Sequence, residues 1–350
     1  MRQNWIIDKS ALILITGANG FVGSKVFEIL LEYGFKNIRC MVRSGRNIPK
    51  LERVASHAGV EVEFVECNLL SRDDCRRASS GASIIFHLAA GTGKSFAGCF
   101  MDSVVATRNL LDATLEKRSL KRFVSISSLA VHSGSLLKPG DLLDETCPIE
   151  TDHMARFDPY CFGKIKEDEL VMSYGRDRRL PYVIVRPGPV YGPGKDALTG
   201  RAGIDTFGFF ICVGGSHTIP IIFVDNCAEA IVLAGLAQGA NGKVLIAVDD
   251  DLPTSAEFVR LYQKHARPIF SIRIPYRAFF LLTWLWERYS KWSEGQLPPV
   301  FNRRKCAAYY QMQKYSNRRL KEATGWTPRV SFEEACRRYF EFVRAQKELS

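Results

Sequence analysis

A tyrosine and a lysine four positions apart, Tyr160 and Lys164, are the residues with the clearest chemical potential. The segment that follows them, KIKEDELVMSYG, predicts a helix, so this spacing places both side chains on one face, one turn apart. A phenol with a pKa near 10 is a poor base at neutral pH, but a neighbouring ammonium stabilises the phenolate. A serine hydroxyl, such as that of Ser128, can orient a substrate oxygen while the phenol takes or gives a proton. The three residues together predict acid–base catalysis, although the Tyr–Lys pair taken alone also fits an exposed helix face.

Two stretches of the chain must position such a site. The first is ALILITGANGFVG (11–23), an aliphatic strand followed by three glycines, Gly17, Gly20 and Gly23, and then by a helix that ends at Gly34. Strand, glycine turn and helix form the layout that binds a dinucleotide: the glycines permit a sharp turn, a close approach to a pyrophosphate and tight packing of helix on strand. The alternative is an ordinary tight turn between a strand and a helix.

The second stretch is KRFVSISS (121–128), a strand that ends in Ser127 and Ser128. Further strands are predicted at 36–43, 60–67, 83–91 and 244–251, with helices at 48–58, from Ser71 and at 103–117. Strands that alternate with helices at this spacing predict an α/β fold with a Rossmann-type doubly wound parallel sheet. The chemistry then lies at the carboxyl ends of the strands, where Ala89 and Ala90 let a cofactor approach the backbone and Asn68 and Leu69 reach the adenine edge.

The residue after the second strand predicts the choice of cofactor. An acid there would bind the ribose 2′-hydroxyl of NAD, but the position is Arg43, followed by Arg46 and Lys50, with no acid before Glu52. A guanidinium can hold a 2′-phosphate with two hydrogen bonds. We therefore expect NADP(H) to be favoured over NAD(H), the alternative being a surface arginine.

Composition excludes several other classes of protein. The 350 residues are 46% hydrophobic and 24% charged, which is typical of a soluble globular protein. No signal peptide and no apolar run long enough to span a membrane are visible, and ten scattered cysteines without a Cys-x-x-Cys pair predict reduced cytoplasmic thiols and no metal site. The net charge of +11 comes with no nucleic-acid motif, so we expect a basic surface or attraction to anionic cofactors and lipid headgroups.

These motifs jointly resemble the extended short-chain dehydrogenase/reductase superfamily (the NAD-dependent epimerase/dehydratase family). The resemblance rests on the glycine turn, His87–Ala90, Ser127-Ser128, Tyr160-x-x-x-Lys164, the segment 186–194, Phe223–Asn226 and the tail 325–332, and it covers nearly the whole chain. It implies a nicotinamide-dependent enzyme with Tyr160 as acid/base, Lys164 as its electrostatic partner and Ser128 as substrate orienter. It also implies cofactor contacts at Thr16, Gly17, Asn19, Gly20, Phe21, Val22, Gly23, Arg43, Asn68, Leu69, Leu88, Ala89, Ala90, Tyr160, Lys164 and Pro187.

Departures from the family pattern favour one branch. The family often has Asn at Ser103, Asp at Asn68 and Tyr at His132, and we interpret His132 as a wall residue. Sugar-nucleotide epimerases usually carry Asn at Pro189 and a charge within 219–224, which is apolar here. The chain therefore looks more like the 3β-hydroxysteroid dehydrogenase branch, acting on an apolar alcohol or ketone (steroid-, terpenoid- or lipid-like). The alternatives are a sugar-nucleotide epimerase or dehydratase and a non-catalytic, cofactor-binding regulatory protein.

The predicted domain organisation is discontinuous. Residues 1–188, with 221–251, form the dinucleotide-binding domain, and residues 189–220 and 252–350 form the substrate-binding subdomain. The Gly-rich segment 201–218 is either a loop or lid beside the pocket or a connector. The segment 275–292 is either a buried helix over the substrate site, which we favour, or a helix in the membrane interface. A homodimer and a peripheral membrane location are compatible with this organisation.

Overall fold

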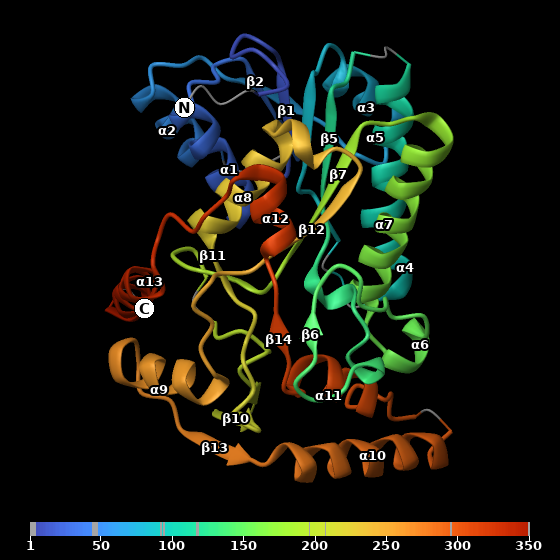
Figure 1. Cartoon of the computed structure of the whole chain (residues 1–350), viewed down its shortest axis with the longest axis vertical. Coiled ribbons are helices and arrows are strands. Elements are labelled where there is room, and N and C mark those ends of the chain that lie inside the picture. The colour runs from blue at the N-terminus through green and yellow to red at the C-terminus, as the bar shows by residue number, and fades with distance from the viewer. Residues whose placement is uncertain are drawn as a thin grey trace.

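A parallel β-sheet organises the molecule (Figure 1). The computed structural model describes residues 5–43, 48–91, 93, 95–116, 119–195, 197–206, 208–294 and 296–348, so that Arg46 lies outside it. Within these residues the sheet has seven strands in the order β12-β7-β5-β4-β1-β2-β3. The strands are β1 (Ile13–Thr16), β2 (Ile38–Val42), β3 (Glu63–Glu66), β4 (Ile84–His87), β5 (Arg122–Ile126), β7 (Tyr182–Pro187) and β12 (Lys243–Ala247).

Alternation along β1 explains how the sheet is covered on both faces. Ile13 and Ile15 point into one core, which α1 and α8 cover, whereas Leu14 points into the core beneath α3, α5 and α7. All three residues are fully buried, as a central strand of a doubly covered sheet requires. This confirms the predicted Rossmann-type fold. The helices are α1 (Phe21–Glu32), α2 (Pro49–His57), α3 (Arg72–Ser79), α5 (Ala106–Leu115), α7 (Pro159–Arg178) and α8 (Val224–Leu236).

The helix predicted at 103–117 begins earlier than expected. A short helix, α4 (Phe96–Cys99), continues through a π-helical turn, η1 (Phe100–Val105), into α5. The π-helical turn brings the chain past Gly91, whose amide donates to Ser103 Oγ at 3.2 Å. This segment therefore lies beside the carboxyl end of β4.

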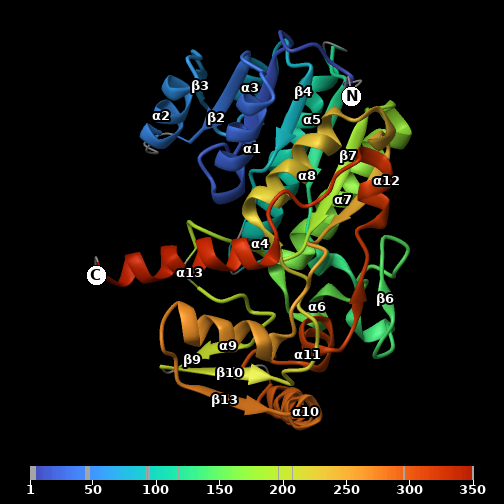
Figure 2. The same ribbon diagram turned by 60° about the vertical axis from the view of Figure 1, so that its left-hand side comes forward.

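A small subdomain lies beyond the carboxyl ends of the strands (Figure 2). Its sheet has the order β13-β10-β9, with β9 (Ile204–Thr206), β10 (Phe209–Val213) and β13 (Ser271–Ile274). The segment 201–218 is thus a strand pair, and neither a lid nor a simple connector. Gly208, with φ +80°, permits the tight turn between its strands, and Phe210 and Cys212 point inward by strand alternation. The helices of this subdomain are α9 (Ser255–His265), α10 (Tyr276–Trp292) and α11 (Arg303–Tyr310).

The C-terminal part of the chain returns to the large sheet. Leu320 and Ala323 of α12 (Arg318–Thr324), together with Trp326, lie in the core shared by α1 and α8. The division predicted at 252–350 stays a prediction, but residues 318–326 pack with the large sheet, whereas β13 and α9 of the same range pack with β10. Helix α13 (Phe332–Glu348) projects from the body in Figure 2. The remaining elements are α6 (His153–Arg156), the strands β6 (Leu142–Leu143), β8 (Val190–Tyr191), β11 (Ile222–Phe223) and β14 (Lys314–Tyr315), and the 3₁₀ turns η2 (Leu129–Val131), η3 (Gly134–Leu136) and η4 (Gln238–Ala240).

Helix α10 is not the buried helix that the sequence favours. It runs along the edge of the molecule farthest from the large sheet (Figure 1), and its outward side chains include Leu281, Leu285 and Trp292, which is 77% exposed. Thr283, the polar residue of its apolar run, is buried beside Phe279, and its hydroxyl is satisfied by donating to the carbonyl of Phe280 at 2.7 Å. Most of the leucines and tryptophans of this helix are left on its outer side.

Candidate active site

The glycine turn after β1 is built as the sequence predicts. Gly17 has φ +69°, and a Cβ at that position would lie 2.9 Å from the amide nitrogen of Ala89. A Cβ on Gly23 would lie 2.1 Å from the carbonyl oxygen of Gly17, closer than any side chain tolerates. Only glycine fits these two positions, so the turn leaves its backbone open at the N-terminus of α1.

A cleft of about 760 Å³ opens above this turn, at the carboxyl ends of β1, β2 and β4. Ten of the residues predicted to bind the cofactor line it: Thr16, Gly17, Asn19, Gly20, Arg43, Asn68, Leu69, Leu88, Ala89 and Ala90. The other six lie outside the lining: Phe21, Val22 and Gly23 in the first turn of α1, Tyr160 and Lys164 in α7, and Pro187 at the end of β7. The position of the cleft, between β1 and β4 where the strand order reverses, is that of dinucleotide sites in this fold.

A buried histidine braces the wall of this cleft. His87 Nδ1 lies 2.8 Å from Thr16 Oγ1, and its Nε2 lies 2.8 Å from Thr107 Oγ1. Thr16 Oγ1 also accepts from the amide of Ala89 at 3.2 Å. Burial and the charge of Lys164 lower the pKa of His87 to about 3, so the ring is neutral. The hydroxyl of Thr16 thus makes its hydrogen bonds within the protein, to His87 and to the amide of Ala89, and stabilises the turn.

Arg43 stands exposed at the end of β2, on the rim of the cleft. It forms no ion pair with any residue in the described part of the chain. Three acids line the cleft, Glu66, Asp74 and Asp102, but none of them pairs with Arg43. Asp74 accepts from the amide of Asn68 at 2.8 Å and pairs with Arg77. The free guanidinium is therefore available to a ligand.

The predicted catalytic residues converge at the start of α7. Asp158 caps this helix by accepting from the amide of Cys161 at 3.1 Å, and Pro159 occupies the first turn. Tyr160 and Lys164 then project on one face, toward the end of β5, where Ser128 hydrogen-bonds Tyr160. Lys164 Nζ donates to the carbonyl of Ile126 at 2.6 Å, which fixes the ammonium at that strand end.

The ionisation of Tyr160 results from opposing effects. Burial raises the pKa of the Tyr160 phenol above its usual value, while the charge of Lys164 and the hydrogen bond from Ser128 act to lower that pKa. Lys164 lowers the pKa of Tyr160, as the sequence predicts, but burial raises that pKa by more. The phenol is therefore protonated at neutral pH in the protein alone.

A layer of buried charges that the sequence reading missed lies beneath these residues. Lys164 Nζ lies 2.9 Å from Glu167 Oε2, and both side chains are almost fully buried. Burial opposes the charge on Lys164, but the Glu167 carboxylate prevails and raises the pKa of Lys164. Asp168 Oδ2 accepts from Arg186 at 2.9 Å and from Ser127 at 2.9 Å. Ser127 is thereby engaged, which leaves Ser128 as the hydroxyl beside Tyr160.

Two signals in the sequence could have revealed this layer. Glu167 and Asp168 follow Lys164 at helical spacings of three and four, and Arg186 interrupts the apolar strand YVIVRP. His132 lies against the same arginine, with its Nε2 3.3 Å from Arg186 NH1. Burial and the charge of Arg186 lower the pKa of His132 to about 3, so it is a neutral residue of the wall.

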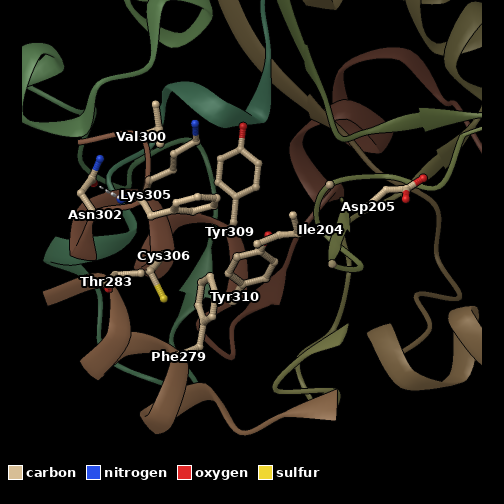
Figure 3. A pocket seen from close by; sticks show the side chains of 13 residues that line it. Ile204, Asp205, Phe279, Thr283, Val300, Asn302, Lys305, Cys306, Tyr309 and Tyr310 are labelled. Atoms are coloured by element: carbon tan, nitrogen blue, oxygen red, sulfur yellow. Dashed lines mark hydrogen bonds between the residues drawn. The ribbon is translucent and has the colours of Figure 1, made fainter. Parts of the chain in front are cut away.

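An apolar cavity of about 300 Å³ lies in the small subdomain, enclosed by β9, α10 and α11 (Figure 3). Phe279 and Thr283 from α10 and Cys306, Tyr309 and Tyr310 from α11 line it. It adjoins the start of α7, because Asn302 donates to the carbonyl of Arg156 at 2.8 Å, and the guanidinium of Arg156 pairs with Asp158 at 3.4 Å. These contacts connect the cavity wall to the cap of α7, two residues before Tyr160.

Other kinds of site are not evident in the described residues. They contain no cluster of three or more His, Cys, Asp or Glu side chains that could hold a metal ion. All ten cysteines are described, and each is a free thiol. No helix in the described ranges is long and apolar enough to cross a membrane.

Comparison with known proteins agrees with this geometry. A cinnamoyl-CoA reductase 1 from Petunia hybrida is 28% identical over 52% of this chain and 55% of its own length, so the match spans about half of that relative. A 2-alkyl-3-oxoalkanoate reductase from Stenotrophomonas maltophilia is 26% identical over 93% of this chain and 97% of its own length. A 3β-hydroxysteroid-dehydrogenase/decarboxylase from Arabidopsis thaliana is 23% identical over 96% of this chain and 81% of its own.

The fold is also found in solved structures. The UDP-glucuronic acid 4-epimerase from Bacillus cereus, solved in complex with NAD, superposes with a TM-score of 0.69 at 18% identity, covering 95% of this chain and 99% of that one. The model of the NAD dependent epimerase/dehydratase family matches residues 13–247, which run from β1 to β12 and include the glycine turn, Ser128, Tyr160 and Lys164. The chain belongs to the NAD dependent epimerase/dehydratase family, within the extended short-chain dehydrogenases/reductases.

Proposed function

We propose that this protein is an NADP(H)-preferring oxidoreductase that interconverts a secondary alcohol and its ketone on an apolar substrate. The observation that carries the proposal is the position of Tyr160. It is buried in the first turn of α7, hydrogen-bonded to Ser128 at the end of β5 and one helical turn from Lys164, whose charge reaches His87 beside the glycine turn. Its relatives include reductases and a dehydrogenase of the same superfamily, which supports an enzyme of that kind.

The residues around the cleft suit a nicotinamide dinucleotide. The backbone of the turn at Gly17 and Gly20 would hold the pyrophosphate, Arg43 the 2′-phosphate, and Leu88, Ala89 and Ala90 the flat side of the cofactor. When bound, the nicotinamide gives or accepts the hydride. The fit supports a cofactor of this class, and Arg43, which forms no ion pair with a described residue, supports NADP(H).

Proton transfer is the part of the reaction that falls to the protein. In reduction, Tyr160 as a phenol donates its proton to the carbonyl oxygen, and Ser128 holds that oxygen in place. In oxidation, the Tyr160 phenolate takes the hydroxyl proton, and the ammonium of Lys164 stabilises the negative charge. Because burial raises the pKa of Tyr160, we expect reduction to be the faster direction at neutral pH.

The cavity supports an apolar substrate. Most of its lining surface is apolar, and a polar sugar would leave most of its hydroxyls there without partners. The S. maltophilia relative is named as a reductase of a 2-alkyl-3-oxoalkanoate, a ketone with an alkyl chain. An apolar ketone of that general kind matches both observations.

A screen for cofactor oxidation tests the proposal. We expect the purified protein to oxidise NADPH in the presence of medium-chain or alicyclic ketones and to release no product from UDP-sugars. Epimerisation of UDP-sugars would favour the sugar-nucleotide alternative. Cofactor binding without turnover of any alcohol or ketone would favour the regulatory protein.

We further propose that α10 docks on an anionic lipid surface. Leu281, Leu285 and Trp292 form an exposed apolar face, and the exposed cations Arg277, Arg288 and Lys291 flank it. The one acid within the helix, Glu287, is paired with Arg303 at 2.9 Å, so the face remains cationic. Apolar side chains at the level of acyl chains and cations at the level of headgroups are typical of interfacial helices.

Docking of α10 suits the proposed substrate. The inner face of the same helix contributes Phe279 and Thr283 to the cavity, so a lipid-dissolved ketone would travel a short path from the surface into the site. A second copy of the chain could cover the same face in place of lipid. Sedimentation of the purified protein without lipid distinguishes lipid docking from pairing of two copies, because only pairing gives a dimer. The predicted homodimer stays a prediction.

A further inference from the structure

The buried cations of the molecule differ in how they are neutralised. Four arginines are buried in the described part of the chain: Arg122, Arg156, Arg186 and Arg201. Arg156 and Arg186 have carboxylate partners at 3.4 and 2.9 Å. Arg122, at the opposite end of β5 from the site, donates to the carbonyls of Ala234 and Ala237 at the end of α8, and burial lowers the pKa of this guanidinium to about 10.

Arg201, like Arg122, has no carboxylate partner, but it lies beside the cavity. It is 6% exposed, and no carboxylate of a described residue lies within 4.0 Å of it. Its NH1 donates to the carbonyl of Ala308, while no described residue accepts from its other nitrogens. A guanidinium has five N–H donors, so most of its capacity is unused, and a buried charge without a counterion is costly.

The ring of Tyr309 links Arg201 to the cavity. The guanidinium carbon of Arg201 lies 4.8 Å from the centre of that ring, and Tyr309 itself lines the cavity. Burial raises the pKa of Tyr309, against the lowering effect of the charges of Arg201 and Arg156. The charge of Asp158 adds to the effect of burial, so the Tyr309 hydroxyl is a protonated donor.

A second cation lies on the same side of the cavity. Lys305 precedes Tyr309 by one helical turn on α11, and Figure 3 shows both side chains pointing the same way from the helix. The ammonium of Lys305 pairs with no carboxylate among the residues that the structure describes, although it lines the cavity. Lys305 and the phenol of Tyr309 thus lie at the cavity, and Arg201 stacks on the Tyr309 ring behind them. The other polar residues of the lining are Asp205, Asn302 and Thr283, and none of them forms an ion pair with either cation.

We propose that Arg201 and Lys305, with Tyr309, bind the carboxylate of an apolar substrate whose hydrocarbon part fills the cavity between α10 and α11. This inference rests on the proposed function and narrows its substrate to an oxo acid or hydroxy acid. A planar carboxylate matches a single stacked guanidinium, whereas a nucleotide diphosphate would bring no apolar part to fill the cavity.

Binding of simple amphiphiles to the full chain with NADP⁺ present tests this without turnover. The probes are decanoate, decanol, decyl phosphate and UDP, titrated by calorimetry. We expect decanoate to bind about tenfold or more tightly than decanol, because charge-assisted hydrogen bonds replace solvation of the buried cation. Equal binding of the two, or tighter binding of UDP or decyl phosphate than of decanoate, would overturn the carboxylate assignment.

Variants locate the site. Arg201→Met should weaken decanoate binding about tenfold or more and leave decanol binding unchanged. Lys305→Met should weaken decanoate binding severalfold. The ammonium of Lys305 makes no hydrogen bond or ion pair with a described residue, so this variant should fold and provides the test if Arg201→Met does not fold. Lys314→Met, which removes an exposed cation of β14, is the control and should bind decanoate as the wild type does.

The outcomes separate this inference from the proposed function. If both variants at the cavity bind decanoate as tightly as the wild type, the anion site is wrong, whether or not ketones are reduced. If decanoate binds as expected but no ketone or oxo acid is reduced, the anion site stands and the proposed oxidoreductase activity fails.

Discussion

The two sides of Tyr160 treat charge in opposite ways. On the side of the large sheet, Lys164 with Glu167 and Arg186 with Asp168 form buried pairs at 2.9 Å, so the charges are neutralised within the protein. On the side of the small subdomain, Arg201 and Lys305 have no carboxylate partner in the described residues. The paired side can hold its geometry without a ligand. The unpaired side is complete only when another molecule supplies an anion.

The exposed face of α10 resembles the side of the small subdomain, because its side chains also lack partners within the chain. Its apolar residues are uncovered in the single chain, just as the cations of the cavity are unneutralised. The difference suggests a division of labour: the sheet side fixes the reacting groups, and the small subdomain recognises substrate and surface.

We expect the largest effect when one partner of the buried pair between Asp168 and Arg186 is removed. Asp168→Asn leaves Arg186 buried without a counterion, and we expect it to lower the free energy of unfolding by about 3–5 kcal/mol in urea denaturation. Lys166→Met, on the same helix, breaks the exposed pair with Glu169 and serves as the control, with a nearly unchanged midpoint. Equal midpoints for the two variants would show that the buried pair does not hold this side together.

Opposite charge changes beside Tyr160 should move its ionisation in opposite directions. Lys164→Met should reduce turnover by about 10²-fold or more and shift the alkaline rise of alcohol oxidation to higher pH, because the phenolate loses its cation. Glu167→Gln should shift that rise to lower pH by about one unit, because the charge of Glu167 raises the pKa of Tyr160. The pH–rate profiles of both variants check the signs, and shifts in the same direction would refute the arrangement.

The surface part of the comparison can be tested on α10. Leu285→Ser with Trp292→Ser should weaken sedimentation with vesicles of phosphatidylcholine and phosphatidylglycerol by about tenfold or more, since each change removes exposed apolar area. The melting temperature should stay the same, because both side chains lie outside the core. Leu136→Ser changes another exposed leucine, away from α10, and should sediment as the wild type does. Absence of wild-type sedimentation would contradict lipid docking.

Arg43 is a third unpaired cation, at the rim of the cofactor cleft. Arg43→Asp should change the ratio of NADP to NAD affinity by about tenfold in favour of NAD, because the guanidinium is replaced by an acid that suits a free ribose hydroxyl. Calorimetric titration with both cofactors measures this ratio. Equal affinities in the wild type, unchanged by the substitution, would show that Arg43 does not read the 2′ position.

The sequence could predict features that depend on residues close together in the chain, and could not predict contacts between distant segments. The glycine turn and the Tyr160–Lys164 spacing are short-range patterns, and each maps onto one turn or one helix face of the structure. The orientation of α10 could not be predicted, because a run that is apolar all round does not say which face is covered, and the single polar residue, Thr283, faces inward. Arg201 and Tyr309 come from segments far apart in the chain, so no spacing connects them before folding.

The most direct test of the account is the rate of ketone-dependent NADPH oxidation by Tyr160→Phe relative to the wild type, with NADPH affinity measured in parallel. The substitution removes only the phenolic oxygen and leaves the Gly17–Gly23 turn intact. We predict a rate reduced by about 10²–10⁴-fold with unchanged NADPH affinity, the size expected for loss of a general acid. Activity close to that of the wild type would contradict the assignment of Tyr160 as the proton donor and, with it, the proposed reaction.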